Sequence, residues 1–179
     1  MYAENTNPSI SLLTLEGVKC VSESLPIILN SPLGLPARSA ARYEAFLCGL
    51  CLGSVGIALY HKVCHILGGS FNLPHSETHV IVLPQALAFN APAIPKFMER
   101  FAEVLLESNG DAIHGLNVLL TKLGVKRGLK EFGFKEENID KAADIAVRNP
   151  YCNPWAIERG PIRELIRRAY AGEDAGADL

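Results

Sequence analysis

Four of the five histidines in this 179-residue chain lie between positions 61 and 79, in the segment HKVCHILGGSFNLPHSETH. They form two pairs with four-residue spacing, His61/His65 and His75/His79. Residues four apart share one face of an α-helix, so each pair projects from a single helix face. Imidazoles on neighbouring helices can bind a divalent metal, transfer protons near neutral pH, or serve only as packing residues. Four histidines in so short a segment favour a chemical site over packing alone.

A metal site on this segment has both support and a difficulty. The loop GGSFN can bring His75 beside His61 and His65, and paired imidazoles suit zinc or iron. A catalytic metal, however, needs three or four protein ligands and often a carboxylate, and Glu77 is the only carboxylate in the segment. The spacing alone leaves metal binding, acid/base chemistry and packing open.

Helical periodicity runs through nearly the whole sequence and predicts an all-α bundle of roughly seven to nine helices. Asn7-Pro8 is expected to open the first helix, and Pro36 the second. The later half of this second helix is small and apolar, so we expect it to be buried on all sides. Cys48 and Cys51 form a CxxC pair there and are predicted to be core residues rather than a redox or zinc site.

The histidine segment is predicted to occupy two helices, the first over about residues 54–67 and the second from near His75. Gly68 and Gly69 are expected to reverse the chain between them, because glycine adopts positive φ freely. The second helix includes VIVLPQALAFN, with a kink at Pro84.

The predicted domain organisation is simple. Residues 1–172 are expected to form a single helical domain, ending in a helix that stops at Gly172, and residues 173–179 a disordered tail.

Composition argues against several classes of function. The net charge of −2 gives no electrostatic support for binding nucleic acid or an anionic membrane, and no apolar run reaches the length of a membrane span. The N-terminus lacks the pattern of a secretory signal, and five cysteines without one indicate a reducing, cytoplasmic setting. Neither GxGxxG after a strand nor GxxxxGK[ST] occurs, so the chain has no recognisable nucleotide-binding unit.

The stretch GIALYHKVCHILGGSFNLPHSETHVIVLPQALAFNAPA closely resembles the iron-containing alcohol dehydrogenase superfamily, and its maleylacetate reductase branch in particular. The flanks NPSISLLTLEGVK and NPYCNPWAIERGPIRELIRRAYAG extend the resemblance over about residues 2–172. It implies the C-terminal helical domain of that dehydroquinate synthase-like fold, packed in the family against an α/β domain that binds NAD(P)H. The family's active site lies in the cleft between these domains, and some members use Fe or Zn.

The resemblance also implies roles for individual residues. His61 and His75 match the two late metal ligands of the metal-dependent members. His65 matches an active-site histidine implicated in substrate binding or proton transfer. His79, in an H-x-E-T-H pattern, lies where the reductase branch has a histidine near the substrate carboxylates.

All four histidines are therefore candidate catalytic residues, with His61 and His75 as metal ligands only if a metal is retained. Asn72, Glu77, Asn153 and Trp155 are candidate substrate-binding residues, and a packing role is the alternative for Trp155.

The departures from the family matter as much as the match. The family's other two metal-ligand positions fall just upstream of YAENTNP, where this chain has Met1, and no nucleotide-binding domain is present in the chain. Two ligands rarely hold zinc or iron without a third, so we expect less than stoichiometric metal and no cofactor held by this chain alone.

Three functions remain open. The first is a free-standing protein that binds a small anionic or enol-rich metabolite and catalyses a non-redox step in specialised metabolism. Dehydration, isomerisation and cyclisation, including pericyclic cyclisation, are such steps. The second is a fragment or split subunit of an NAD(P)H-dependent maleylacetate reductase, whose branch reduces the olefinic bond of maleylacetate and is thought not to need the metal. The third is a non-catalytic binding or scaffold protein. In each case a homodimer or a partner chain is expected to cover an exposed apolar face.

Overall fold

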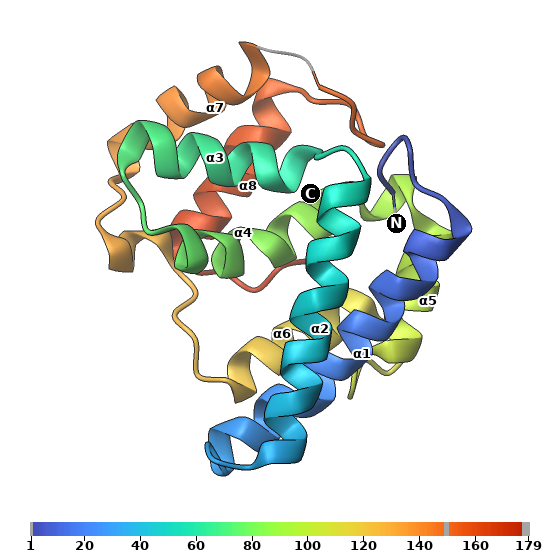
Figure 1. The fold of residues 1–179 in the computed structure, drawn as a ribbon. Coiled ribbons are helices and arrows are strands. Elements are labelled where there is room, and N and C mark those ends of the chain that lie inside the picture. The colour runs from blue at the N-terminus through green and yellow to red at the C-terminus, as the bar shows by residue number, and fades with distance from the viewer. Residues whose placement is uncertain (1, 149–150, 177–179) are drawn as a thin grey trace. The chain divides into compact units, whose positions relative to one another are not determined.

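The computed structural model describes residues 2–148 and 151–176 of the chain, and this part is built of helices without a β-strand (Figure 1). The all-α prediction is confirmed. Eight α-helices follow one another along the described residues: α1 Pro8–Asn30, α2 Leu35–Ser54, α3 Leu59–Phe71, α4 His75–Asn90, α5 Pro95–Val104, α6 Ala112–Lys122, α7 Ile139–Arg148 and α8 Arg159–Ala171. Short 3₁₀ helices cover Ala91–Ala93, Leu129–Phe132 and Glu136–Asn138.

The chain divides into two compact units. Met1–Gly56 and Pro95–Val125 form unit 1, with α1, α2, α5 and α6. Ile57–Ile94 and Lys126–Leu179 form unit 2, with α3, α4, α7 and α8. No single helix in the described ranges is long and apolar enough to cross a membrane, and α2 and α3 meet that criterion only as a bent pair.

Unit 1 is organised around the hairpin of α1 and α2. As predicted, α1 opens at Asn7-Pro8, and the Asn7 side chain caps it by accepting a hydrogen bond from the backbone N–H of Ile10 at 3.0 Å. Gly17 lies on the face of α1 that meets α2, where a Cβ would contact Cβ of Leu47 at 3.6 Å, an ordinary van der Waals distance. Ser22 joins the hairpin to α5 through a 3.2 Å hydrogen bond to the carbonyl of Val104.

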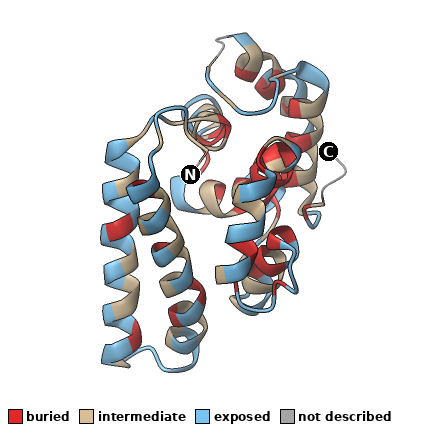
Figure 2. Cartoon of the chain, turned by 90° about the vertical axis from the view of Figure 1, so that its right-hand side faces the viewer, coloured by how far each residue is buried: buried red, intermediate tan, exposed pale blue. Residues whose placement is uncertain are grey.

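The prediction that the later half of α2 is buried on all sides is wrong. Leu47 is the only buried residue in that half, and Figure 2 shows how little of the α1–α2 hairpin is buried. Cys48 is exposed beside Glu44, and Cys51 is half-buried against the carbonyl of Ile10. The physical reason is that α2 packs on α1 along one face, so its small and apolar residues on the other faces remain in contact with solvent.

Unit 2 contains the larger hydrophobic core. Helices α3, α4, α7 and α8 enclose fully buried aliphatic and aromatic side chains, which include Leu59, Leu67, Val82, Phe89, Leu129, Ile139, Ile162, Leu165 and Ile166. The VIVL run lies within α4, and this helix continues through Pro84 to Asn90. Burial of these side chains on several helices outweighs the strand propensity of the run.

The boundaries of α3 differ from those predicted. The helix begins at Leu59 rather than near 54, and Gly68 and Gly69 lie inside it instead of reversing the chain. Asn72 makes the reversal in the left-handed conformation, with φ of 55°, which asparagine tolerates better than most residues. Burial of Leu67 compensates the modest cost of two glycines in a helix.

The first residues after α8, within the predicted tail over 173–179, contact unit 2. Gly172 ends α8 in the left-handed conformation, as predicted. The backbone carbonyl of Glu173 then accepts a 2.7 Å bond from the buried side chain of Gln85, and Asp174 pairs with Arg127 at 3.0 Å. These contacts hold Glu173 and Asp174 against unit 2, and residues 177–179 lie outside the described residues.

A pair of asparagines joins the segment before α8 to the core. Asn90 is fully buried at the end of α4, and its amide exchanges hydrogen bonds of 2.7 and 3.2 Å with the amide of Asn153. Asn153 also accepts from the backbone N–H of Leu59 at 3.4 Å and donates to the carbonyl of Trp155 at 2.8 Å.

We therefore predict that Asn153→Ala lowers the free energy of unfolding by about 1–3 kcal/mol, because it leaves the buried Asn90 amide without its partner. Urea unfolding followed by circular dichroism measures the change. The matched control is Asn30→Ala, which removes an exposed asparagine from the end of α1 and should cost less than about 0.5 kcal/mol. Equal losses in the two variants would contradict the proposed role of the asparagine pair.

Candidate functional site

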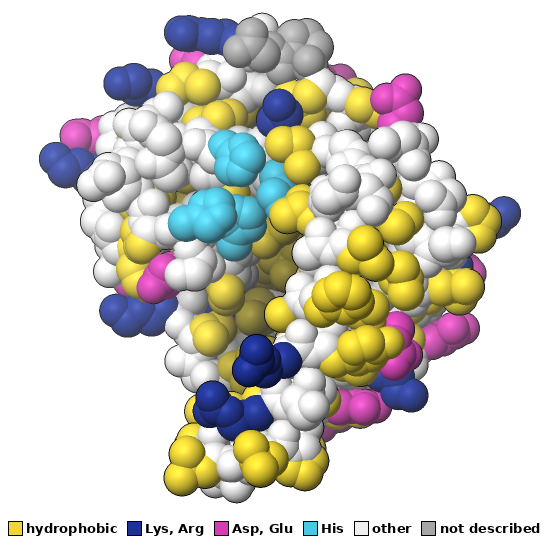
Figure 3. Space-filling model, in the orientation of Figure 1, with side chains coloured by type: hydrophobic (Ala, Val, Ile, Leu, Met, Phe, Trp, Pro, Cys, Tyr) yellow, Lys and Arg dark blue, Asp and Glu magenta, His cyan; other side chains and the backbone are white. Residues whose placement is uncertain are grey.

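The two histidine pairs meet where α3 packs on α4. His61 and His65 come from α3, and His75 and His79 from α4. The ring centroids are 4.2 Å apart for His75–His79, 5.2 Å for His61–His79, 6.1 Å for His61–His65 and 6.3 Å for His65–His75. Figure 3 shows histidine side chains gathered on one face of the molecule. The structure thus brings together all four residues that the sequence singled out, and we name them the histidine cluster.

The two ring nitrogens of His79 lie in different environments. Its Nδ1 is 2.9 Å from the hydroxyl of Tyr60, and this hydroxyl donates to the backbone carbonyl of His79 at 3.1 Å. Its Nε2 is buried and has no hydrogen-bond partner among the described residues. His65 and His75, in contrast, are exposed. The cluster therefore has an exposed rim and one buried, unpaired ring nitrogen.

Burial and mutual repulsion keep part of the cluster neutral. Burial first, and then the neighbouring histidines with His75 foremost, together lower the pKa of His79 to about 4. Burial is also the main cause that lowers the pKa of His61, followed by His65 and His75. Both imidazoles are consequently uncharged at pH 7 and can donate one hydrogen bond and accept another.

The residues of the cluster do not form a complete metal site. Over residues 2–148 and 151–176, no group of three or more histidine, cysteine or acidic side chains is arranged to hold a metal ion. Cys64, next to His65, is buried, its Sγ lies 4.0 Å from the carbonyl of Thr78, and burial raises the pKa of its thiol to about 12. The ligand count falls short of what iron or zinc needs.

The four candidate substrate-binding residues lie in different settings. Asn72 is exposed at the end of α3, and the Glu77 carboxylate on the first turn of α4 accepts a 2.6 Å bond from Ser76. Trp155 is exposed, whereas the side-chain amide of Asn153 is fully engaged by the contacts described above. Contact of Asn153 with a substrate would have to replace one of those bonds.

Tyr60 is the residue of the site that sequence analysis missed. It contacts both His61 and His79 edge-on, with ring centroids 4.9 and 5.0 Å away. Its place one residue before His61 was the available signal. Neighbours in a helix do not share a face, so the spacing did not indicate that the two rings meet.

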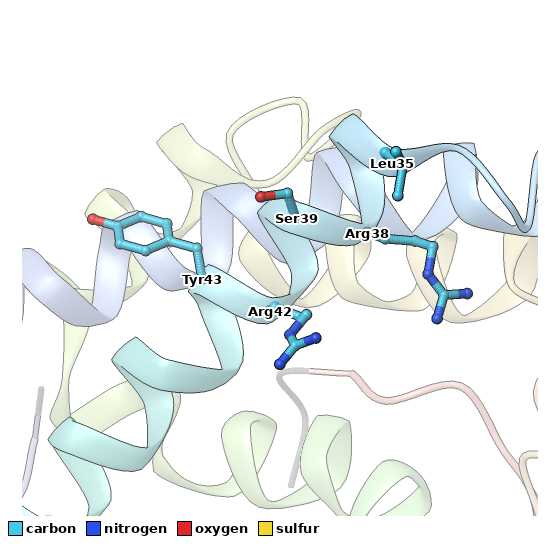
Figure 4. A pocket seen from close by; sticks show the side chains of 5 residues that line it. All are labelled: Leu35, Arg38, Ser39, Arg42 and Tyr43. Carbon is cyan, nitrogen blue, oxygen red and sulfur yellow. The ribbon is translucent and has the colours of Figure 1, made fainter.

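A second feature lies on α2 in unit 1. Leu35, Arg38, Ser39, Arg42 and Tyr43 line an open hollow (Figure 4). The two arginines point to one side of the helix, and Leu35, Ser39 and Tyr43 to another. The hollow is lined by one helix only, so it is a surface feature rather than an enclosed site.

Comparisons with known proteins agree with the helical architecture and with the sequence resemblance. The model for the C-terminal region of the Fe-containing alcohol dehydrogenase family matches residues 1–170. The maleylacetate reductase of Burkholderia cepacia is 45% identical over 172 residues, which cover 96% of this chain and 48% of that protein. The maleylacetate reductase of Delftia acidovorans is 42% identical over 173 residues, which cover 97% and 49%.

Solved structures give the same correspondence. The crystal structure of maleylacetate reductase from Agrobacterium tumefaciens superimposes with a TM-score of 0.91 at 38% identity, over 96% of this chain and 48% of that one. The predicted family resemblance and fold are thereby confirmed. The chain spans about half the length of the curated relatives it matches.

The lowered histidine pKa values predict a dependence of stability on pH. Between pH 6.5 and about 4 the unfolded chain binds a proton on His79 and the folded chain does not, so the free energy of unfolding should fall as the pH drops through this range. His79→Gln should flatten that decline. Urea unfolding at several pH values from 4.5 to 7 measures it, with His114→Gln on α6 as control. Parallel pH profiles for wild type and His79→Gln would contradict the assignment.

Proposed function

The chain belongs to the Fe-containing alcohol dehydrogenase family, and from this membership we propose that it is the helical, substrate-binding half of a maleylacetate reductase-like enzyme. The observation that carries the proposal is the histidine cluster, assembled on α3 and α4 within a chain that aligns with maleylacetate reductases along nearly all of its own length. The complementary half of such an enzyme would bind NAD(P)H.

The histidine cluster suits the proton side of this reaction. Reduction of a carbon–carbon double bond conjugated to a carbonyl places negative charge on the carbonyl oxygen and requires a proton at the adjacent carbon. Neutral His61 and His79 can donate hydrogen bonds to such an oxygen where little water competes. The exposed His65 and His75 are placed at the rim, where a proton can be exchanged with solvent.

The cofactors of the family are not held by the described residues alone. NAD(P)H supplies the hydride when bound, but this chain has no glycine-rich phosphate-binding motif of the common types. The described residues also lack a three-ligand metal site, so we assign no step to iron or zinc. The role we propose for this chain is to bind the substrate, orient it and handle its protons.

A non-redox reaction is the second candidate. The observation in its favour is that the cluster is complete within α3 and α4 and includes a buried, unpaired nitrogen, His79 Nε2. Such a site can move a proton on an enol-rich metabolite, as dehydration, isomerisation or cyclisation requires, without a nucleotide.

A partner surface follows from the exposed side of α2. Four exposed side chains share this side: Leu35, Tyr43, Phe46 and Leu50. Together with Ser39 they follow one another at spacings of four, four, three and four residues, which places them on one helix face. We name the four apolar residues the apolar stripe. Because the relatives are about twice as long as this chain, we propose that their other, nucleotide-binding half is the kind of partner that covers the stripe.

A chimera tests the reductase proposal. Replacing the matching 48% of the Burkholderia cepacia reductase with this chain should give a protein that oxidises NADH when maleylacetate is added, followed at 340 nm. His79→Gln in the chimera should lower kcat/KM by about 100-fold or more, because general acid–base groups contribute that much, and His114→Gln should not. A folded chimera that binds NADH but leaves maleylacetate unreduced would overturn the proposal. Turnover of maleylacetate without NADH would favour the non-redox candidate.

Charge placed on the apolar stripe tests the partner surface. Phe46→Lys combined with Leu50→Lys should weaken binding to the separately produced N-terminal half of the Burkholderia cepacia reductase at least tenfold, measured by calorimetry, since both side chains would enter the interface charged. Leu33→Lys is the matched control, because Leu33 is 87% exposed and lies in the loop between α1 and α2. Unchanged binding would contradict the assignment. Loss of self-association instead, seen by sedimentation velocity, would assign the stripe to a second copy of this chain.

A further inference from the structure

The contact between Tyr60 and His79 has a consequence for where the imidazole proton lies. The Tyr60 hydroxyl has one hydrogen, and two acceptors of His79 lie within its reach, the backbone carbonyl at 3.1 Å and Nδ1 at 2.9 Å. If the hydroxyl donates to the carbonyl, the Nδ1 contact is a hydrogen bond only when Nδ1 carries a proton and donates it to the hydroxyl oxygen. Both short contacts are then hydrogen bonds. With the proton on Nε2 instead, only one of them can be.

The burial of Nε2 favours the same tautomer. This nitrogen has no hydrogen-bond partner among the described residues. A buried N–H donor left unpaired is rarer in proteins than an under-used acceptor. With the proton on Nδ1, Nε2 is a bare lone pair in the histidine cluster, next to the rings of His75 and His61.

From this geometry we propose that Tyr60 is a positioning residue that holds the His79 proton on Nδ1 and presents Nε2 as a hydrogen-bond acceptor to an alcohol or enol hydroxyl of a small carboxylic acid. The choice of a carboxylic acid rests on the proposed function. The tautomer itself does not, because it follows from contacts within unit 2.

Nitrogen NMR of the full chain tests the tautomer without any substrate. In ¹⁵N-histidine-labelled protein at pH 8, two-bond ¹H–¹⁵N correlations distinguish Nδ1–H from Nε2–H imidazoles, and loss of signals in His79→Gln assigns those of His79. We expect the Nδ1–H pattern for wild-type His79 and a shift towards Nε2–H in Tyr60→Phe. An Nε2–H pattern in the wild type would overturn the proposal, and this outcome requires no variant at Tyr60 to fold.

Tyr151→Phe is the matched control. The hydroxyl of Tyr151 is buried in the same unit and has no hydrogen-bond partner among the described residues. Removing it should therefore leave the His79 tautomer unchanged. A tautomer shift in both variants, or in neither, would mean that the Tyr60 hydroxyl does not set the proton position.

Two four-carbon acids test the acceptor role. L-Malate carries a hydroxyl, and succinate is the same diacid without it. Malate should move the His79 Nε2 resonance to lower frequency, as a new hydrogen bond does, and succinate should not. Equal effects of the two acids, or no effect of malate, would overturn the acceptor role while leaving the tautomer result intact. Activity of the chimera is measured separately, so failure of the reductase proposal can be told apart from failure of this one.

Discussion

The packing of α3 on α4, set by the reversal at Asn72, is the constraint on which the site depends. The left-handed backbone of one residue turns the chain so that two helices, each with a histidine pair on one face, lie side by side. Leu67, Val82 and the rest of the unit 2 core then fix the distance between these helices. The spacing of the four imidazole rings is thus a consequence of apolar burial beneath them, and no metal or disulfide is required to explain it.

Unit 1 and unit 2 show opposite relations between sequence and burial. In unit 2 the apolar residues of α3 and α4 are enclosed, and even the polar Gln85 and Asn90 are buried with partners. In unit 1, α2 is as apolar in its later half, yet it exposes Phe46 and Leu50. An apolar surface of this kind on a helix that packs along one face is typical of a surface made for a partner.

The elements could be predicted from the sequence to the extent that local physics determines them. Asn7 and Asp111 cap helices through their own side chains, and Gly172 ends α8 because it adopts positive φ at no steric cost. The four-residue spacing predicted that each histidine pair shares a helix face, and the loop between the pairs suggested that His75 lies beside His61 and His65. Tyr60 and the Asn90–Asn153 pair could not be predicted, because their partners lie 19 and 63 residues away. The exposure of Cys48 depends on which surfaces are covered, which no local pattern encodes.

The composition of the histidine cluster bears on two chemical uses, the binding of a metal ion and acid/base chemistry on a bound substrate. A catalytic zinc or iron site needs three or four protein ligands, which often include a carboxylate. Here the one carboxylate in the segment, Glu77, bonds to Ser76, and Tyr60 takes up Nδ1 of His79. The remaining groups are the neutral imidazoles of His61 and His79 and the exposed imidazoles of His65 and His75. They lie beside the first turn of α4, and the N-terminal end of a helix favours negative charge. In the function that we propose, the donors and acceptors of this cluster meet the hydroxyl and carbonyl oxygens of an anionic molecule.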